Sequence, residues 1–410
     1  MIPIDRSTSV YPSLRRASAA LLLALLPATS PAAAYGAQPP APAVAVAVAH
    51  SARAVPGQYI VTLKHGRDPG EVLRALGITP RFTYGAALNG FAAALDPLLL
   101  NTVRTNPAVE AVEENTTFRL PTPVDGADRP GHTTRATAAT WGLDRIDQRY
   151  LPLDGQFTTR GHGAGATAYI LDSGIDYTHP EFGGRAVPGF DAIGDGRDGL
   201  DCHGHGTHVA GTVGGRTYGV APRARLVSVR VVDCTGSGDK AQMIAGLDWV
   251  ARDARYPAVL NASLGEERSR AVNDAATALS DQGVLPVVAA GNDAVDACTV
   301  SPASAYGVVT VAATNRRDEE TDFSNWGTCV ALHAPGQAIL SAKLGGGSTT
   351  LSGTSMAAPH VTGTAALYLA EHPDAEPIDV SDFLQYTATP DVLTDVREGT
   401  PNLLLFTDDL

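Results

Sequence analysis

Basic residues, and lysine above all, are scarce in this sequence, and it has no long apolar run. Only Lys64, Lys240 and Lys343 are lysines, and 30 basic residues stand against 43 acidic ones, which gives a formal net charge of −13. Nucleic acids and anionic membrane surfaces bind clustered basic side chains, so the sequence argues against both as the main partner. No apolar run reaches the roughly 18 residues of a membrane-spanning helix, and the run from Ala17 to Leu26 is too short.

Cysteine is also scarce, and the four cysteines matter because the chain begins like an exported protein. Arg15 and Arg16 precede the apolar run Ala17 to Pro27, and Ala32 to Ala34 offers a small-residue cleavage site. We therefore expect residues 1–34 to be a signal peptide and the protein to be secreted. Four cysteines in such a chain suggest two disulfides, for which three connectivities are open.

Residues 35–139 divide into a linker, a small patterned unit and a second linker. Residues 35–54 are rich in Pro, Ala and Val, and we predict no structure there. Residues 55–120 predict a small α+β unit of ferredoxin type, in the order β-α-β-β-α-β. Its expected strands are 58–63, a pair within 81–95 broken at Asn89-Gly90, and 109–113, and its expected helices are 69–76 and 97–105. Residues 121–139, rich in Pro, Asp, Gly and Thr, indicate a boundary where an exported chain is processed.

Residues 140–410 predict one larger α/β domain. Short β-branched runs alternate with amphipathic helical patterns, which favours a doubly wound, mostly parallel sheet with helices on both faces. Pro286 cannot donate to a strand ladder, so we expect it near the start of its strand. The expected strands are 167–171, 225–232, 258–262, 284–290 and 308–312, and the expected helices are 240–252, 271–282 and 356–370.

A serine opens the last of these helices, in the segment Gly353 to His360. At the start of a buried helix, free backbone N–H groups and the positive end of the helix dipole stabilise developing negative charge, which suits a nucleophile. Taken alone, Ser355 is more simply explained as an ordinary N-cap residue. The functional interpretation therefore depends on a base elsewhere in the chain.

Candidate bases lie in a stretch that holds His203, His205 and His208. A transition-metal site and surface histidines on a glycine-rich loop are the two alternatives. The stretch lacks the His-Glu-x-x-His arrangement of zinc peptidases, so a general base is the better interpretation. Asp172 follows the expected strand 167–171, where functional groups of such sheets collect. Asp172, His205 and Ser355 thus supply orienter, base and nucleophile in an order known for serine peptidases.

Four separated blocks of this sequence resemble the subtilisin-like serine peptidases, most closely their proteinase K and aqualysin branch. They are Ile170-Leu171-Asp172-Ser173-Gly174, Gly204-His205-Gly206-Thr207-His208-Val209-Ala210-Gly211, Ala289-Ala290-Gly291-Asn292 and Gly353-Thr354-Ser355-Met356-Ala357-Ala358-Pro359-His360. Residues 55–120 are similar to the inhibitor-type propeptide of that family, and Trp141 to Asp147 resembles the opening of a mature enzyme. The resemblance implies a subtilisin-like fold and a secreted serine endopeptidase made as a zymogen that processes itself.

The resemblance also implies roles for single residues. Asp172, His205 and Ser355 would form the catalytic triad, and the side chain of Asn292 with the N–H of Ser355 would form the oxyanion hole. The segment Ser263, Leu264, Gly265 would pair with substrate backbone, which favours broad specificity. This chain then departs from its relatives, because Glu266-Glu267 stands where glycines are expected, and we hypothesise that these carboxylates alter subsite preference towards basic side chains.

Disulfides and calcium follow from the same resemblance. Cys202 would pair with Cys234, and Cys298 with Cys329. Catalysis would need no cofactor. Relatives hold a structural Ca²⁺ at the segment that matches Tyr306 and Val308, with a carboxylate at the position of Ala331, so we expect that site to be weak or empty, although the acidic stretch Asp191 to Asp201 offers other oxygen ligands.

The implied partners are protein and peptide substrates and the chain's own propeptide, acting on a monomer. Two rival functions remain open at this point. One is a secreted binding protein that has lost activity, and the other is a metal-dependent hydrolase that uses the three histidines.

Overall fold

Residues 45–120, 140–408 and 410 are described by the structure, a computed structural model. The expected signal peptide, the first half of the first linker and the expected processing segment 121–139 lie outside the described residues. Residues 45–120 are called the N-terminal unit below, and residues 140–410 the C-terminal unit. Both belong to one compact unit, Ala43–Leu410.

The N-terminal unit has the expected ferredoxin-type order. Its elements are β1 (Val48–Ala49), β2 (Ala54–Leu63), α1 (Pro69–Leu76), β3 (Phe82–Tyr84), β4 (Gly90–Ala94), α2 (Pro97–Thr105) and β5 (Val109–Arg119). The strands lie in the order β1-β5-β2-β4-β3, and β2, β3, β4 and β5 pair antiparallel. Both helices begin with an Asp-Pro pair: the side chains of Asp68 and Asp96 accept backbone N–H bonds of the first turn, and proline fits the first helical position.

The prediction that residues 35–54 lack structure is wrong for their described end. β1 pairs parallel with β5, matching Val48 with Val112, and Val46 and Arg104 are joined by two hydrogen bonds. The Ala/Val repetition of this segment suits a strand that adds to an existing sheet edge, although it is too uniform to build a core of its own. An arm of residues 45–53 therefore precedes the ferredoxin-type unit.

The C-terminal unit is built on a mostly parallel sheet, as expected. From one edge to the other its strands are β18 (Thr389–Pro390), β19 (Leu403–Leu404), β15 (Leu332–Pro335), β14 (Val309–Thr314), β12 (Leu285–Ala289), β10 (Ala258–Ala262), β6 (Thr167–Asp172), β8 (Arg225–Arg230) and β7 (Ala186–Asp191). Among these neighbours, only β18 and β19 pair antiparallel. Pro286 is the second residue of β12, near the strand start as predicted.

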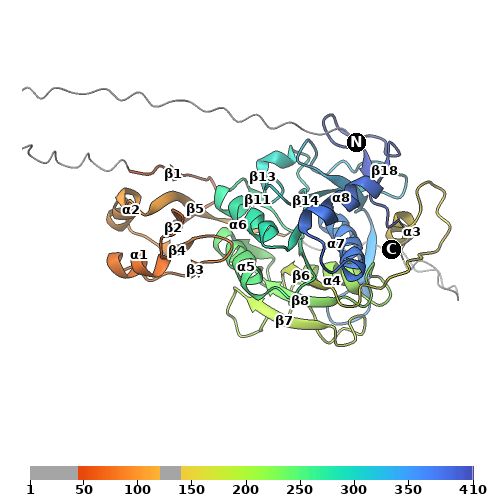
Figure 1. Ribbon diagram of the computed structural model, residues 1–410, viewed down its shortest axis with the longest axis horizontal. Helices are drawn as coiled ribbons and strands as arrows, with labels where there is room; N and C mark the ends of the chain where they lie inside the picture. The colour runs from red at the N-terminus through yellow and green to blue at the C-terminus, as the bar shows by residue number, and fades with distance from the viewer. Residues whose placement is uncertain (1–44, 121–139, 409) are drawn as a thin grey trace, which may run out of the picture. The chain divides into compact units, whose positions relative to one another are not determined.

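Helices cover both faces of this sheet. The helices are α3 (Trp141–Ile146), α4 (His205–Gly214), α5 (Lys240–Asp253), α6 (Arg270–Asp281), α7 (Thr354–Glu371) and α8 (Pro377–Thr387). Residues of α4 and α7 belong to one buried apolar cluster, while residues of α5 and α6 belong to a second one. Figure 1 shows α5 and α6 beside the N-terminal unit, whose side chains Ile60, Tyr84 and Phe118 join the second cluster.

The remaining strands are short and lie outside the central sheet. They are β9 (Ser237–Asp239), β11 (Glu266–Glu267), β13 (Val300–Ser301), β16 (Ile339–Ala342) and β17 (Ser348–Leu351). β11 pairs antiparallel with β13, and β16 with β17. β9 pairs antiparallel with β5 of the N-terminal unit, so one sheet runs from that unit into the C-terminal unit.

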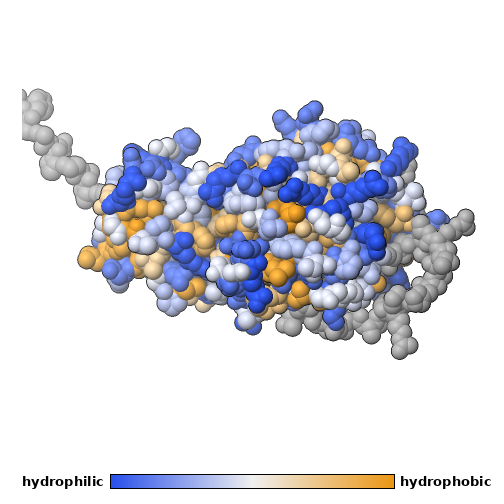
Figure 2. Space-filling view, turned by 90° about the horizontal axis from the view of Figure 1, so that it is seen from below, coloured by the Kyte–Doolittle hydropathy of each residue, from blue (hydrophilic) through white to orange (hydrophobic). Residues whose placement is uncertain are grey.

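On the face drawn in Figure 2, hydrophobic residues form separate small areas among hydrophilic ones. Within the described residues, each helix is too short or too polar to cross a bilayer.

The structure contains the disulfides Cys202–Cys234 and Cys298–Cys329, the pairing that the resemblance implies. Their partners are separated by 32 and 31 residues in the sequence. Closing a loop of that length stabilises a folded chain by about 3.5 kcal/mol in the chain-entropy account.

Candidate active site

Asp172 and His205 meet at the carboxyl end of the central sheet. Asp172 is the last residue of β6, and His205 is the first residue of α4. The Nδ1 atom of His205 lies 2.9 Å from both carboxylate oxygens of Asp172, and both side chains are buried. The carboxylate also accepts a bond from the N–H of Ser173 at 2.7 Å, which fixes its orientation.

This pairing sets the basicity of the imidazole. Burial alone would lower the pKa of His205, but the charge of Asp172 and its hydrogen bond outweigh burial and raise the pKa above 6.5. The Nε2 atom of His205 is buried and has no hydrogen-bond partner among the described residues. A raised pKa and a free Nε2 are what a general base requires.

Asp201 positions this histidine, and the sequence analysis missed it. Its carboxylate accepts bonds from the hydroxyl of Ser173 and from the N–H and the hydroxyl of Thr207, in the first turn of α4. A negative charge at a helix start is favourable, so Asp201 holds the N-terminus of α4 against the end of β6. Gly206 permits this close approach, because a Cβ atom there would lie 2.2 Å from the carbonyl oxygen of Gly174.

The neighbouring histidines do not form a metal site. His208 is buried, and its Nε2 contacts the carbonyl oxygens of Ile339 and Thr349 at 3.0 and 3.2 Å. Burial lowers the pKa of His208 to about 3, so it is neutral at ordinary pH. No three His, Cys, Asp or Glu side chains in the described residues are grouped so as to hold a metal ion. His205 and His208 are buried in a helix, so the loop interpretation fails for both.

Ser355 is the second residue of α7, and the N-cap is Gly353. The interpretation of Ser355 as an ordinary cap is therefore wrong, because its hydroxyl donates instead to the carbonyl oxygen of Ser263 at 3.0 Å. Gly353 has φ 152°, a conformation that L side chains rarely adopt. Ser355 lies in the first turn of α7, so its backbone N–H has no acceptor within the helix.

Pro359 lies inside α7, and its effect on the hydrogen bonds of the helix connects the helix start to the end of β10. A proline has no N–H, so the carbonyl oxygen of Ser355, four residues earlier, loses its helical donor. The hydroxyl of Ser263 donates to that oxygen at 2.9 Å, and the side chain of Asn261 donates to the same hydroxyl. The start of α7 is thereby fixed to the segment 261–263.

The structure brings Asp172 to His205 but shows no hydrogen bond between His205 and Ser355, whose hydroxyl faces Ser263. α4 and α7, which carry the two residues, pack against each other. The hydrogen bond from the hydroxyl of Ser355 to Nε2 of His205 that a triad requires is therefore not present in this structure. Such contacts often tighten only when substrate binds.

Asn292 follows β12 and is held by the residue before the serine. Its Oδ1 accepts bonds from the N–H and the hydroxyl of Thr354, at 2.8 and 3.0 Å. Because Oδ1 already accepts these two bonds, the Nδ2 group of Asn292 is the part of the amide that can donate a hydrogen bond into the cleft. Thr354 is a second residue that the sequence analysis missed.

Replacing Asn292 tests whether its amide stabilises an oxyanion. We expect Asn292→Ala to lower kcat by about 10²- to 10³-fold with little change in KM, because the bond forms only in the transition state; the magnitude comes from a subtilisin, not from this structure. Asn292→Asp keeps the acceptor for Thr354 but has no donor, so it should lose at least as much. Steady-state kinetics on a peptide substrate decide the matter, and a rise in KM at constant kcat would assign Asn292 to ground-state binding.

A cleft of about 790 Å³ opens beside Ser355. The C-terminal unit contributes the predicted segment Ser263 to Glu266 together with Asn292 and Thr354, while the N-terminal unit contributes Arg119 and Leu120. The backbone of Thr117 to Arg119 pairs with β9, and the N–H of Leu120 donates to the carbonyl oxygen of Gly236 at 2.7 Å. The end of the N-terminal unit is therefore an extended strand whose last residues line the cleft.

Glu266 and Glu267 lie along this cleft, and both accept hydroxyl bonds from the N-terminal unit. The hydroxyl of Thr116 donates to Glu266 at 2.5 Å, and that of Ser51 donates to Glu267 at 2.6 Å. Burial raises the pKa of Glu266 to about 7, while Glu267 is exposed. Neither carboxylate forms an ion pair with a basic side chain in the described residues.

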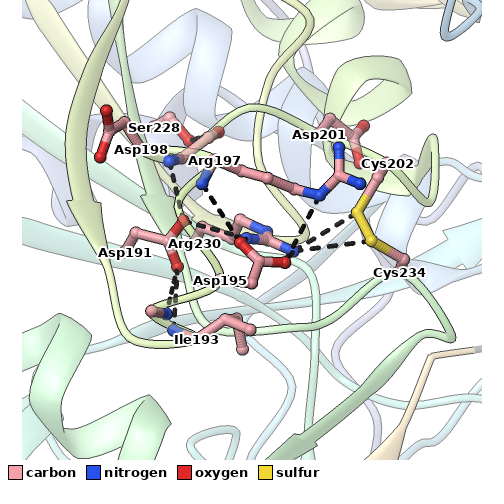
Figure 3. Close-up of polar contacts among 12 residues, drawn as sticks. Asp191, Ile193, Asp195, Arg197, Asp198, Asp201, Cys202, Ser228, Arg230 and Cys234 are labelled. Carbon is pink, nitrogen blue, oxygen red and sulfur yellow. Dashed lines mark hydrogen bonds and ion pairs between the residues drawn. A yellow bond between two sulfur atoms is a disulfide. The ribbon is translucent and has the colours of Figure 1, made fainter.

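The acidic stretch that was considered for calcium is used by protein donors. Arg230 lies between Asp191 and Asp195, at 2.9 and 2.7 Å, and beside the Cys202–Cys234 disulfide (Figure 3). Asp191 also accepts backbone N–H bonds, including one from Ile193. These oxygens do not fit a cation site, and Ala331 supplies no carboxylate at the other expected position.

A parallel sheet with a buried Asp–His pair beyond its carboxyl ends, a serine at a helix start, and a cleft lined by the end of the chain's own N-terminal unit define a class, the serine peptidases made with an inhibitory propeptide. Residues 163–404 match the Subtilase family, and residues 76–121 match the Peptidase inhibitor I9 family. The chain belongs to the subtilase family, and its N-terminal unit is an inhibitor-type propeptide.

Similar proteins agree with this assignment. The "Extracellular serine proteinase" of Thermus sp. (strain Rt41A) is 45% identical over 384 residues, which cover 86% of this chain and 90% of that protein. The "Alkaline serine exoprotease A" of Vibrio alginolyticus is 46% identical over 320 residues, 78% of this chain and 59% of that protein. A crystal structure of a cold-adapted subtilisin-like serine proteinase, 49% identical, superposes with a TM-score of 0.64 over 65% of this chain and 97% of that one.

Proposed function

We propose that this subtilase is a secreted endopeptidase of broad specificity that uses Asp172, His205 and Ser355 as a catalytic triad and removes its own propeptide. The observation that carries the proposal is the buried Asp172–His205 pair. The Nε2 atom of His205 has no hydrogen-bond partner among the described residues, and α4, which carries this histidine, packs against α7. Secretion is supported by the signal-type first 34 residues and by the relative named as extracellular.

Each side chain has a definite part in this chemistry. The hydroxyl of Ser355 attacks the scissile carbonyl carbon while its proton passes to Nε2 of His205, which Asp172 keeps oriented and stabilises as an imidazolium. The amide of Asn292 and the N–H of Ser355 hold the oxyanion. The imidazolium then protonates the leaving amine, and a water molecule, deprotonated by the same histidine, hydrolyses the acyl-enzyme.

The proposal of broad specificity is supported by the way in which the propeptide strand pairs beside the cleft. Its pairing with β9 uses main-chain groups, and such recognition tolerates many side chains. Phe118 is an exception, because a Cβ atom at Gly238 would lie 2.6 Å from its ring. We infer that substrates bind as the propeptide does, with an apolar side chain at the position of Phe118.

The test of the triad is the contrast between a serine-directed inhibitor and a chelator. A sulfonyl fluoride is expected to abolish peptidase activity and to add one sulfonyl group, which peptide mapping should locate on Ser355. A chelator should leave the initial activity unchanged, since catalysis here needs no cofactor. Loss of activity with the chelator alone would favour the metal-dependent alternative, and an adduct on another residue would exclude Ser355 as the nucleophile.

A further inference from the structure

Glu266 is a buried carboxyl group at the boundary between the propeptide and the peptidase. It is only 5% exposed, and its Oε2 contacts the hydroxyl of Thr116 of the propeptide. Its Oε1 is buried and has no hydrogen-bond partner among the described residues. An ionised carboxylate with one unsatisfied oxygen is costly at such a place, whereas a neutral carboxyl group is far less so.

Charge pairing in the surrounding cluster also leaves Glu266 without a cation. Lys240 is paired with Glu113 of the propeptide at 3.1 Å, and Arg81 of the propeptide is paired with Asp239. Three buried carboxyl groups thus share two basic side chains. Glu113 has two further donors, the hydroxyl of Ser269 and the N–H of Ala271, so Glu266 is the carboxyl group that is left without a basic partner.

The other charged groups near this cluster do not compensate for Glu266. Arg53 and Arg119 of the propeptide line the same cleft but are exposed, and neither forms an ion pair with Glu266 in the described part of the chain. The remaining groups pair with one another or face solvent, and they are Glu267, Arg268 and Asp293, which are exposed, His50 with Glu114, and Arg270 with Glu110 and Asp274. Burial, Glu113 and Asp239 raise the pKa of Glu266 to about 7, although Lys240 and Thr116 oppose the shift.

We propose that Glu266 takes up a proton when the propeptide binds, so that the propeptide is held tightly in acid and is released as the medium becomes neutral. Departure of the propeptide removes Thr116, which covers the carboxyl group, and Glu113, which occupies Lys240. Glu266 is then hydrated and shares Lys240, and both changes favour the ionised form. The inference rests on the propeptide role of the N-terminal unit but does not depend on the triad.

The sign follows from the linkage between proton and propeptide binding. The pKa of Glu266 is higher in the complex than in the free peptidase, where an ordinary glutamate titrates at about 4.3. The additional binding free energy is present in full when the pH is below the pKa of Glu266 in the free peptidase. It is lost as the pH rises towards the pKa of about 7 that Glu266 has in the complex. The dissociation constant should therefore rise about tenfold per pH unit between roughly pH 5 and pH 7, about 100-fold in all, and stay level above.

The experiment measures propeptide binding rather than activity, so that the titration of His205 does not interfere. Full-length Ser355→Ala protein is cut within residues 121–139 by brief treatment with trypsin, for which that segment offers Arg135. The trypsin is then inactivated. The dissociation constant of the two fragments is determined from pH 5 to pH 9 by gel filtration over a concentration series. The intact masses of both fragments after each measurement show whether either has been cleaved further, so the binding result stands even if the proposed triad is wrong.

Glu266→Gln mimics the protonated form, so it should bind the propeptide about as tightly at pH 8 as at pH 5. Glu267→Gln, at the exposed neighbour, and His50→Gln should both keep the pH dependence of the unaltered pair. A dissociation constant of the unaltered pair that is constant between pH 5 and pH 7 overturns the proposal. So does a pH dependence that persists unchanged in Glu266→Gln. The first of these outcomes needs no substitution at Glu266 and holds even if that variant does not fold.

Discussion

Ser355→Ala is expected to abolish peptidase activity, with kcat lowered by about 10⁶-fold, a magnitude taken from a subtilisin rather than from this structure. The loss is large because neither Asp172 nor His205 can act without the hydroxyl. The same substitution should stop maturation. Intact mass and N-terminal sequence of the secreted protein should show a chain that still contains the propeptide, whereas the unaltered protein should begin within residues 121–139.

Ser352→Ala is the matched control. Ser352 lies three residues earlier, is exposed, and accepts a bond from the N–H of Ala338 outside the site. It should mature and cleave substrate normally. Purified Ser355→Ala protein that still hydrolyses peptides would end the triad hypothesis, and a Ser355→Ala chain that matures in isolation would show that an activity other than this serine processes the junction.

Asp172→Asn is expected to lower kcat by about 10⁴-fold, as the same change does in other serine peptidases. The amide nitrogen of asparagine donates a hydrogen bond, which favours the wrong tautomer of His205. The acid limb of the pH–activity profile should move as well. Activity requires neutral His205 and is lost as pH falls through its pKa, which Asp172 holds above 6.5. Without the charge of Asp172, burial lowers the pKa of His205, and the acid limb shifts to lower pH.

A profile of kcat/KM from pH 5 to pH 10 measures both effects. Asp176→Asn serves as the control, because the carboxylate of Asp176 accepts bonds from Thr178 and Gly345 and has no contact with His205. Its acid limb should stay in place. An acid limb unchanged in Asp172→Asn would mean that another group controls the ionisation of the base.

The sequence predicts best those elements whose signals are local. The bounds of α1 and α2 agree with the prediction because an Asp-Pro pair marks each start. α4 was not predicted, since glycine, threonine and histidine are weak helix formers; the helix depends on Asp201 and on burial between other elements. β9 carries no strand pattern in its Ser-Gly-Asp sequence and forms where β5 supplies a partner.

In the candidate site, too, local sequence signals could be recognised, whereas contacts between distant segments could not. The residue types and chain order of Asp172, His205 and Ser355 were visible in the sequence, and the Asp172–His205 contact is present in the structure. The acidic residue just ahead of the histidine block was a signal that could have identified Asp201. The hydrogen bonds by which Thr354 holds Asn292 and Ser263 holds the carbonyl of Ser355 could not be predicted, because they join segments more than 60 residues apart.

The proline inside α7 has a consequence for motion. Because the carbonyl of Ser355 is bound by Ser263 rather than by its own helix, the start of α7 is coupled to the segment that we propose to pair with substrate. We therefore expect the proposed nucleophile to move little relative to a bound peptide, even when both move relative to the rest of the enzyme. Pro359→Ala would restore the helical N–H as a competitor for that carbonyl, uncouple the two segments, and allow the nucleophile to drift from the bond that it attacks.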